Sequence, residues 1–279
     1  MCERFTAETG ICLTRKVDSP YITNEAWAAD ATVEDNPGVY TKVAPSYAAS
    51  ALFLYRVGRP DIAASTQRLC SKVTYWTTVH DKALIRLMCY AFSTREFVVT
   101  GSLSPVDLID LQLHCYSDAD LNGNPETSKS ASGWWVELAS KSSDRTFPLS
   151  WGVSGQTSTS CSTAESETVA FSHALRREAL PIQSLLEDAL GQPIEVLCLV
   201  DNTQCIQAVE KGYSKKFRHL PRTQRVCLGL LNEIITDPEL HVSLKHCPTA
   251  VMKADIFTKS MPGPRFSETS LLIGMHARL

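Results

Sequence analysis

The stretch that decides the fold is Leu111-Gln-Leu-His-Cys-Tyr-Ser-Asp118. Its apolar and polar residues alternate, as in a β-strand with one buried face, and a carboxylate stands at its end. Two more strand candidates follow, at residues 133–138 and 147–151, and a polar loop at residues 140–145 joins them. We therefore expect an antiparallel three-stranded meander at the start of a domain.

The chain after this meander alternates between helical and strand patterns. A helix is expected from Thr163 to Leu180, with an interruption at Pro181, and a second one from Ile182 to Leu190. The mainly apolar run at residues 194–200 has strand length and is typical of a strand buried on both faces. Later elements complete the pattern: helices at residues 202–210 and 222–235, a strand at 241–247 and a short helix at 252–259. The order β-β-β-α-β-α-α-β-α predicts an α/β fold with a mixed five-stranded sheet flanked by helices.

The first hundred residues have a different character, because they contain few strand patterns. Residues 1–45 are expected to be irregular, and apolar residues at helical spacing then predict three helices, at residues 47–55, 62–75 and 79–92. We expect three regions: a mostly helical segment at residues 1–109, the sheet domain at 110–262 and a tail at 263–279.

Composition excludes several classes of protein. The chain has 279 residues, of which 44% are hydrophobic, and a net charge of −3, so it is globular without a strongly basic surface overall. Its ten cysteines form no Cys-x-x-Cys pair, which argues against a zinc ribbon and fits a reducing compartment. No secretory signal is visible, and the longest apolar run, residues 48–55, is far shorter than the roughly 20 residues of a membrane span. We expect an intracellular protein, in the cytoplasm or nucleus, with no membrane partner.

Four carboxylates stand in the order Asp, Glu, Asp, Asp at the ends of strands or on helices. Taken alone, an aspartate at a strand end is most often a solvated turn residue. Several carboxylates that converge from different elements, however, are the oxygen ligands that Mg²⁺ prefers. The candidates for both catalysis and metal binding are Asp118, Glu167, Asp201 and Asp255, with Glu165 as the alternative to Glu167.

Around these carboxylates the sequence resembles the ribonuclease H region of copia-type LTR retrotransposon polyproteins. The corresponding segments are Tyr116-Ser-Asp-Ala-Asp-Leu121, Ser162-Thr-Ala-Glu-Ser-Glu-Thr168, Leu199-Val-Asp-Asn202 and Ala254-Asp-Ile-Phe-Thr-Lys259. Upstream, three segments resemble the end of the family's reverse transcriptase: Ser46-Tyr-x-x-Ser50-x-Leu-x-Leu54, Arg59-Pro-Asp-Ile62 and His80-x-Lys-Ala-Leu-x-Arg86. Together they cover roughly residues 40–265.

The resemblance implies a ribonuclease H-like fold preceded by a helical remnant of a reverse transcriptase. It also implies an endonuclease that hydrolyses the RNA strand of RNA–DNA hybrids with two Mg²⁺ ions, or Mn²⁺ in their place, and no small-molecule cofactor. The remainder of a retrotransposon polyprotein would be a further partner.

Some residues depart from the family pattern. Leu121 stands where the family has Trp, and Thr168 where it has Tyr; both positions look like packing positions. No Tyr-x-Asp-Asp polymerase motif occurs, so the chain is expected to start after the catalytic strand of the polymerase, and no polymerase activity is expected.

One segment is strongly basic and contains two aromatic residues. Residues 211–225, which we call the basic segment, are expected to bind the phosphates of a nucleic acid without reading its sequence. A solvated surface loop would have the same composition. Its six cationic residues are Lys211, Lys215, Lys216, Arg218, Arg222 and Arg225. His246, on the last predicted strand, is a candidate auxiliary group for proton transfer, although a surface histidine would be commoner there.

Two other functional classes remain open from the sequence. The chain could be a catalytically inactive relic of a retroelement that at most binds nucleic acid, or a structural connection module with a role only inside a longer polyprotein. The complete carboxylate set favours the enzyme.

Overall fold

The computed structural model describes residues 1–28, 36–123 and 127–278. The chain divides into two compact units: Met1–Val99 together with Lys259–Leu279, and Thr100–Thr258. The segment expected as a tail, residues 263–279, instead contains a helix, α12 (Gly263–Leu272), and a strand, β7 (Met275–Ala277), and it belongs to the first unit.

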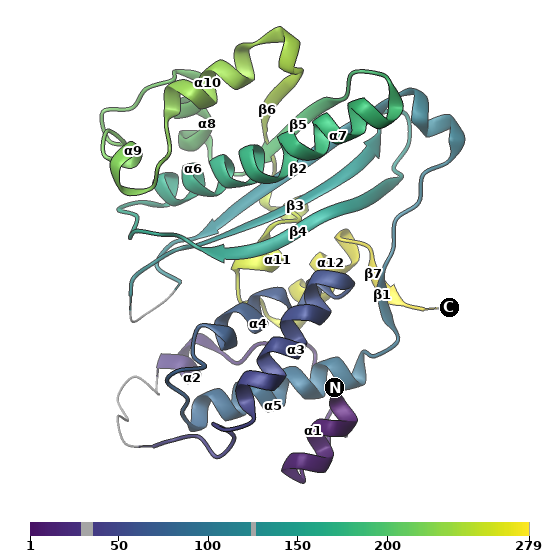
Figure 1. Cartoon of the computed structure of the whole chain (residues 1–279), viewed down its shortest axis with the longest axis vertical. Coiled ribbons are helices and arrows are strands. Elements are labelled where there is room, and N and C mark those ends of the chain that lie inside the picture. The colour runs from purple at the N-terminus through teal and green to yellow at the C-terminus, as the bar shows by residue number, and fades with distance from the viewer. Residues whose placement is uncertain (29–35, 124–126, 279) are drawn as a thin grey trace. The chain divides into compact units, whose positions relative to one another are not determined.

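The first unit is mostly helical, as the sequence predicts (Figure 1). Residues 1–45, however, are not irregular throughout, because two helices form there. The predicted helix at 62–75 ends early, at Cys70. Strand β7 pairs antiparallel with β1 (Phe97–Val99). The helices are α1 (Cys2–Thr9), α2 (Asn24–Ala28), α3 (Ala44–Val57), α4 (Ala63–Cys70), α5 (Thr78–Ser93) and α12.

The second unit contains the predicted mixed five-stranded sheet, in the order β4-β3-β2-β5-β6. Strands β2, β3 and β4 form the antiparallel meander, and β5 and β6 add to β2 in parallel. The prediction of an α/β fold with this sheet is confirmed. The strands are β2 (Leu111–Asp120), β3 (Ala131–Ser140), β4 (Thr146–Gly155), β5 (Glu195–Val200) and β6 (Val242–His246).

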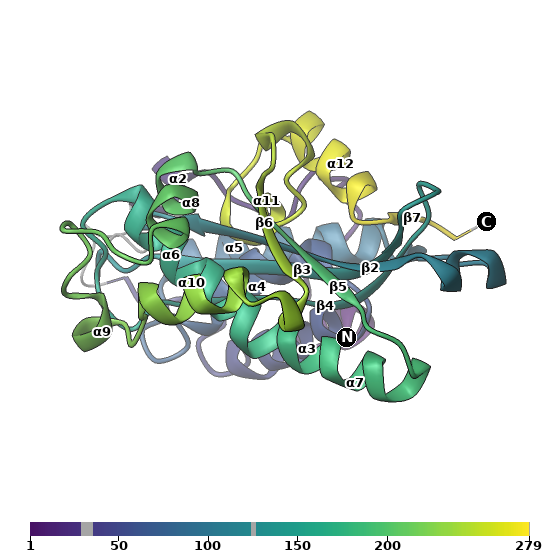
Figure 2. The same ribbon diagram turned by 90° about the horizontal axis from the view of Figure 1, so that it is seen from above.

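Helices of the second unit lie on both faces of its sheet (Figures 1 and 2). Helix α6 (Thr163–His173) packs against β2 and β3 on one face, where Leu113 and Cys115 enter the main apolar core. Helix α11 (Asp255–Thr258) packs against the same two strands and β4. Because side chains alternate along a strand, Tyr116 and Asp118 face α11 rather than α6.

Three predicted helices differ from the structure. Pro181 does not interrupt the long helix, because a π-helical segment, Ala174–Ala179, widens the turn before it and continues into α7 (Leu180–Leu190). The helix predicted at 222–235 is divided at Arg225, whose φ of 57° is left-handed. Helix α11 is shorter than the predicted 252–259. The remaining helices of this unit are α8 (Thr203–Glu210), α9 (Leu220–Thr223) and α10 (Leu228–Thr236).

Two further observations concern membrane-spanning helices and the state of the cysteines. Within the described ranges, no helix is long and apolar enough to cross a membrane. All ten cysteines are free thiols.

Candidate metal centre

Three of the four predicted carboxylates meet at one place. Each of Asp118, Asp201 and Asp255 offers a carboxylate oxygen within 4.8 Å of those of the other two. Asp118 and Asp255 are buried, and Asp201 is partly exposed. The three residues come from three different elements, so only the fold brings them together.

Strand register places the first two aspartates side by side. Strands β2 and β5 are parallel neighbours, and Tyr116 is level with Leu199. Two residues further on, Asp118 and Asp201 lie just past the last pair between β2 and β5, although Asp118 is still paired with β3. The chain turns directly after Asp201, because the Asn202 side chain accepts hydrogen bonds from Gln204 N–H and Cys205 N–H (3.0 and 3.1 Å) and so caps α8.

The third aspartate comes from α11, which lies unusually close to β3. Gly133 is the register partner of Asp118. A Cβ atom on Gly133 would lie 2.7 Å from Thr258 Cγ2 and 2.8 Å from Phe257 Cβ, so only glycine allows this approach. The Thr258 hydroxyl then donates a hydrogen bond to Asp118 Oδ2. A glycine on the sheet thus lets the helix that carries Asp255 reach Asp118.

A buried ion pair holds the segment just before Asp255. Lys253 Nζ lies 2.6 and 2.8 Å from the two carboxylate oxygens of Glu137. Glu137 is only 1% exposed to solvent. Trp135 Nε1 donates to the same carboxylate at 2.8 Å, and the Lys253 ammonium lies 5.6 Å from the Tyr116 ring centroid. This pair was not predicted. Its signal in the sequence is a glutamate inside the apolar strand Trp134-Trp-Val-Glu-Leu138.

Negative charge is concentrated around these residues. Burial is the main cause that raises the pKa of the Cys205 thiol to about 12, and the charges of Glu167 and Asp201 act in the same direction. Burial likewise raises the pKa of Cys247 to about 11, with Asp201 and Asp255 adding to the effect. Closely spaced carboxylates repel one another, so a bound cation would stabilise this arrangement by offsetting the repulsion.

The two glutamates of α6 have different surroundings. The backbone N–H of Cys161 donates to Glu165 Oε2 (3.0 Å), and His219 Nε2 lies 2.9 Å from Glu165 Oε1. Glu167 is 2% exposed, and its charge acts on Cys205, as that of Asp201 does. Neither glutamate belongs to the group of three aspartates in the described part of the chain. The preference for Glu167 as the fourth ligand stays a prediction.

The other predicted residues lie on the surface. His246 is exposed on β6, level with Val200 and therefore next to the strand end that leads into Asp201. All six cationic residues of the basic segment are exposed, whereas Phe217, Leu220 and Gln224 of the same segment are buried. The segment is thus anchored by its buried residues, with its charges on the surface.

No protein-family model matches the chain. Among solved structures, it is similar to LC11-RNase H1, isolated from compost by a metagenomic approach, at 19% identity and a TM-score of 0.37 over 53% of this chain and 92% of that one. LC11-RNase H1 in complex with an RNA/DNA hybrid is similar at 17% identity and a TM-score of 0.37, over 53% and 94%. Prototype foamy virus protease–reverse transcriptase is similar at 14% identity and a TM-score of 0.31, over 63% of this chain and 22% of that chain.

The strand order and directions of the second unit, with helices on both faces, are those of a ribonuclease H-like fold, as the sequence predicts.

Proposed function

We propose that the protein is a metal-dependent ribonuclease H, an endonuclease that hydrolyses the RNA strand of RNA–DNA hybrids. One observation carries the proposal: Asp118, Asp201 and Asp255, from three separate elements, place carboxylate oxygens within 4.8 Å of one another. We further propose that the chain derives from a copia-type retrotransposon polyprotein. That origin rests on the sequence motifs around these residues.

The donor set fits Mg²⁺, or Mn²⁺, because both prefer carboxylate oxygens and water. We propose that Asp118, Asp201 and Asp255 hold two such ions together with Glu167, which is buried and near the same charges. When bound, two ions of this kind activate a water molecule and stabilise the leaving 3′ oxygen of the cleaved strand.

The residues around the carboxylates have supporting roles in this proposal. The hydroxyl of Thr258 orients the Asp118 carboxylate, and the ion pair of Glu137 with Lys253 positions the segment that leads to Asp255. His246, exposed beside the β5 end, is proposed to assist proton transfer or product release. The basic segment is proposed to bind the phosphates of the hybrid.

A second function is a nucleic-acid-binding relic without catalysis. The six exposed cations of the basic segment suit this function equally well, because binding of phosphates needs no hydrolysis. The two proposals differ in one property, which is hydrolysis.

The test uses the purified full chain and a hybrid labelled on its RNA strand. With Mg²⁺ we expect cleavage of the RNA strand and none in EDTA. Asp118→Asn removes a ligand charge worth several kcal/mol of transition-state stabilisation, so cleavage should fall by at least about a hundredfold.

The matched control is Asp188→Asn, which changes an exposed aspartate on α7 and should leave the rate unchanged. Hybrid binding without metal-dependent cleavage by the unmodified protein would establish the relic instead. Equal loss in both variants would show that the effect is not specific to the carboxylate site.

A further inference from the structure

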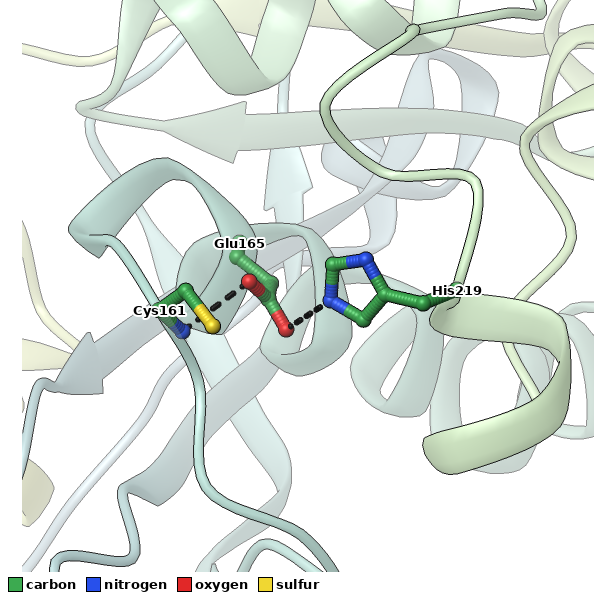
Figure 3. A group of neighbouring side chains, drawn as sticks. All are labelled: Cys161, Glu165 and His219. Carbon is green, nitrogen blue, oxygen red and sulfur yellow. Dashed lines mark hydrogen bonds and ion pairs between the residues drawn. The ribbon is translucent and has the colours of Figure 1, made fainter.

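A second group of potential metal ligands shares no residue with the three aspartates. Cys161, Glu165 and His219 each offer one ligand atom, and these atoms lie within 4.8 Å of one another (Figure 3). Cys161 is exposed, Glu165 is buried and His219 is partly exposed. The group therefore has a buried carboxylate at its base and an opening to solvent.

Helix capping explains only part of this arrangement. Ser162 is the N-cap of α6, and its side chain accepts from the Glu165 N–H. The Glu165 carboxylate reaches back to the Cys161 N–H through Oε2, which also suits the positive end of the helix dipole. Oε1 is not needed for the cap and instead faces His219 Nε2 at 2.9 Å. The carboxylate thus has one oxygen for the cap and one directed toward the other two donors.

The two backbone segments that supply the donors are fixed to each other nearby. Gln224 Oε1 accepts from the Thr157 hydroxyl at 3.0 Å, and Gln224 Nε2 donates to Ser158 O at 2.6 Å. The Ser158 hydroxyl also donates to Thr223 O at 2.8 Å. These bonds hold the loop before α6 against α9, so Cys161 and His219 approach each other on a supported frame, although 58 residues separate them in the sequence.

We propose that Cys161, Glu165 and His219 form a binding site for a transition-metal ion, best suited to Zn²⁺. One thiolate sulfur, one imidazole nitrogen and one carboxylate oxygen are the three donor types that zinc accepts, and three protein ligands leave a fourth position for water. Mg²⁺ and Ca²⁺ disfavour sulfur and nitrogen, so this site and the aspartate group select different metals.

The geometry needs only side-chain rotation to close around the ion. Zinc bonds of about 2.0–2.3 Å in a tetrahedron place the ligand atoms about 3.3–3.8 Å apart. The ligand atoms all lie within 4.8 Å of one another, so an approach of at most about 1.5 Å brings them to this range. His219 Nε2 and Glu165 Oε1, now 2.9 Å apart, would separate slightly instead. Cys161 is exposed and can change its rotamer freely, whereas Glu165 is already held in place by the cap. The ion would replace the direct contact of His219 with Glu165.

A metal ion here would join the start of α6 to the basic segment, which contains His219. The exposed cations of that segment would then be fixed relative to α6, the helix that carries Glu167. The bound ion would thus hold the proposed nucleic-acid surface in one position relative to α6. Metal binding at this site does not depend on whether the protein cleaves a hybrid.

The test titrates the full, metal-free chain with Co²⁺, which absorbs visibly when a thiolate binds it. We expect one equivalent with a thiolate-to-cobalt band, and Zn²⁺ should displace it. In Cys161→Ser the band should disappear, and zinc affinity should fall at least about tenfold, the lower end of what even an outer-shell change costs. His219→Gln should weaken zinc binding in the same way.

Two controls keep the outcome specific. Cys227→Ser changes another exposed cysteine of the same unit and should keep the band, and Asp118→Asn should also keep it although it disables the proposed cleavage site. A protein without a thiolate band, or a band that survives in Cys161→Ser, would overturn the proposal. Circular dichroism of each variant verifies that the fold is intact.

Discussion

Among single residues, Glu137 and Lys253 form a buried ion pair next to the carboxylate site. Both are largely removed from solvent, with side-chain exposures of 1% and 13%. An ion pair of this kind contributes little net stability, but removal of one partner leaves a buried charge uncompensated. The pair joins the middle of β3 to the segment before Asp255, so its loss would affect both folding and the site.

We expect Lys253→Met to lower the free energy of unfolding by about 3–5 kcal/mol, because the Glu137 carboxylate would remain buried without its partner. The double change Glu137→Gln with Lys253→Met should recover most of this loss, since no charge is then left alone. Urea unfolding in EDTA measures both effects.

The control for this prediction is Lys245→Met, which changes an exposed lysine on β6 and should alter stability by less than about 0.5 kcal/mol. A Lys253→Met protein as stable as the unmodified one would show that Glu137 is solvated or protonated without its partner.

At the scale of elements, the contact of α11 with β3 decides whether the three aspartates meet. Trp135 stacks on Phe257 with ring centroids 6.1 Å apart, and Gly133 leaves the space that Thr258 fills. Such a contact tolerates almost no added volume, because protein interiors are packed as densely as organic crystals.

Gly133→Ala should therefore move α11 away from the sheet. We expect a loss of about 1–3 kcal/mol in stability from overpacking, together with weaker Mg²⁺ binding, because Asp255 moves away from Asp118. Calorimetric titration with Mg²⁺ and urea unfolding measure the two effects.

Gly155→Ala on β4 is the matched change, because its added Cβ would contact nothing within 4 Å. It should leave both quantities unaltered. Unchanged Mg²⁺ affinity in Gly133→Ala would mean that the helix position does not control the site.

The basic segment is the second element with a testable role. Replacement of Lys215, Lys216 and Arg218 by alanine should weaken binding to any hybrid, whatever its sequence. The slope of log affinity against log salt should decrease in magnitude by about one for each phosphate that the variant no longer neutralises. Fluorescence anisotropy at several salt concentrations measures this slope, and an unchanged slope would identify the segment as a solvated surface.

At the scale of the whole molecule, the unit Thr100–Thr258 contains all four proposed carboxylates, the five-stranded sheet and its own apolar core. Its first residues are part of its structure. Asp107 forms an ion pair with Arg145 (2.7 Å), and the Ser102 N–H donates to Thr146 O at 2.9 Å. Arg145 holds the pKa of Asp107 well below its ordinary value. A fragment that starts at the predicted domain boundary, residue 110, would lack these interactions.

A fragment of residues 100–262 should fold on its own with cooperative thermal unfolding, since its core and sheet are complete. The shorter fragment 110–262 should have a lower midpoint of unfolding, because it lacks Asp107 and Ser102. Both end at residue 262, so that no terminal carboxylate lies beside Asp118. Equal midpoints would show that residues 100–109 do not stabilise the unit.

Local patterns in the sequence were sufficient for much of the fold. The alternation at 111–118 and the apolar run at 194–200 predicted β2 and β5, because a strand's side-chain period is visible in consecutive residues. The order of carboxylates, together with the family resemblance, predicted Asp118, Glu167, Asp201 and Asp255 as one group. The structure brings the three aspartates together. Two of them, Asp118 and Asp201, follow parallel neighbouring strands that end at the same edge of the sheet.

The tertiary structure alone decided the features that depend on residues far apart in the chain. Glu137 and Lys253 are 116 residues apart, and no local period relates them. The same holds for Glu165 and His219, which are in contact although 54 residues separate them in the sequence. The π-helical segment before Pro181 and the left-handed Arg225 were likewise visible only in the folded chain. Periodicity reports which face of an element is buried, but only the folded chain determines which distant side chain lies opposite it.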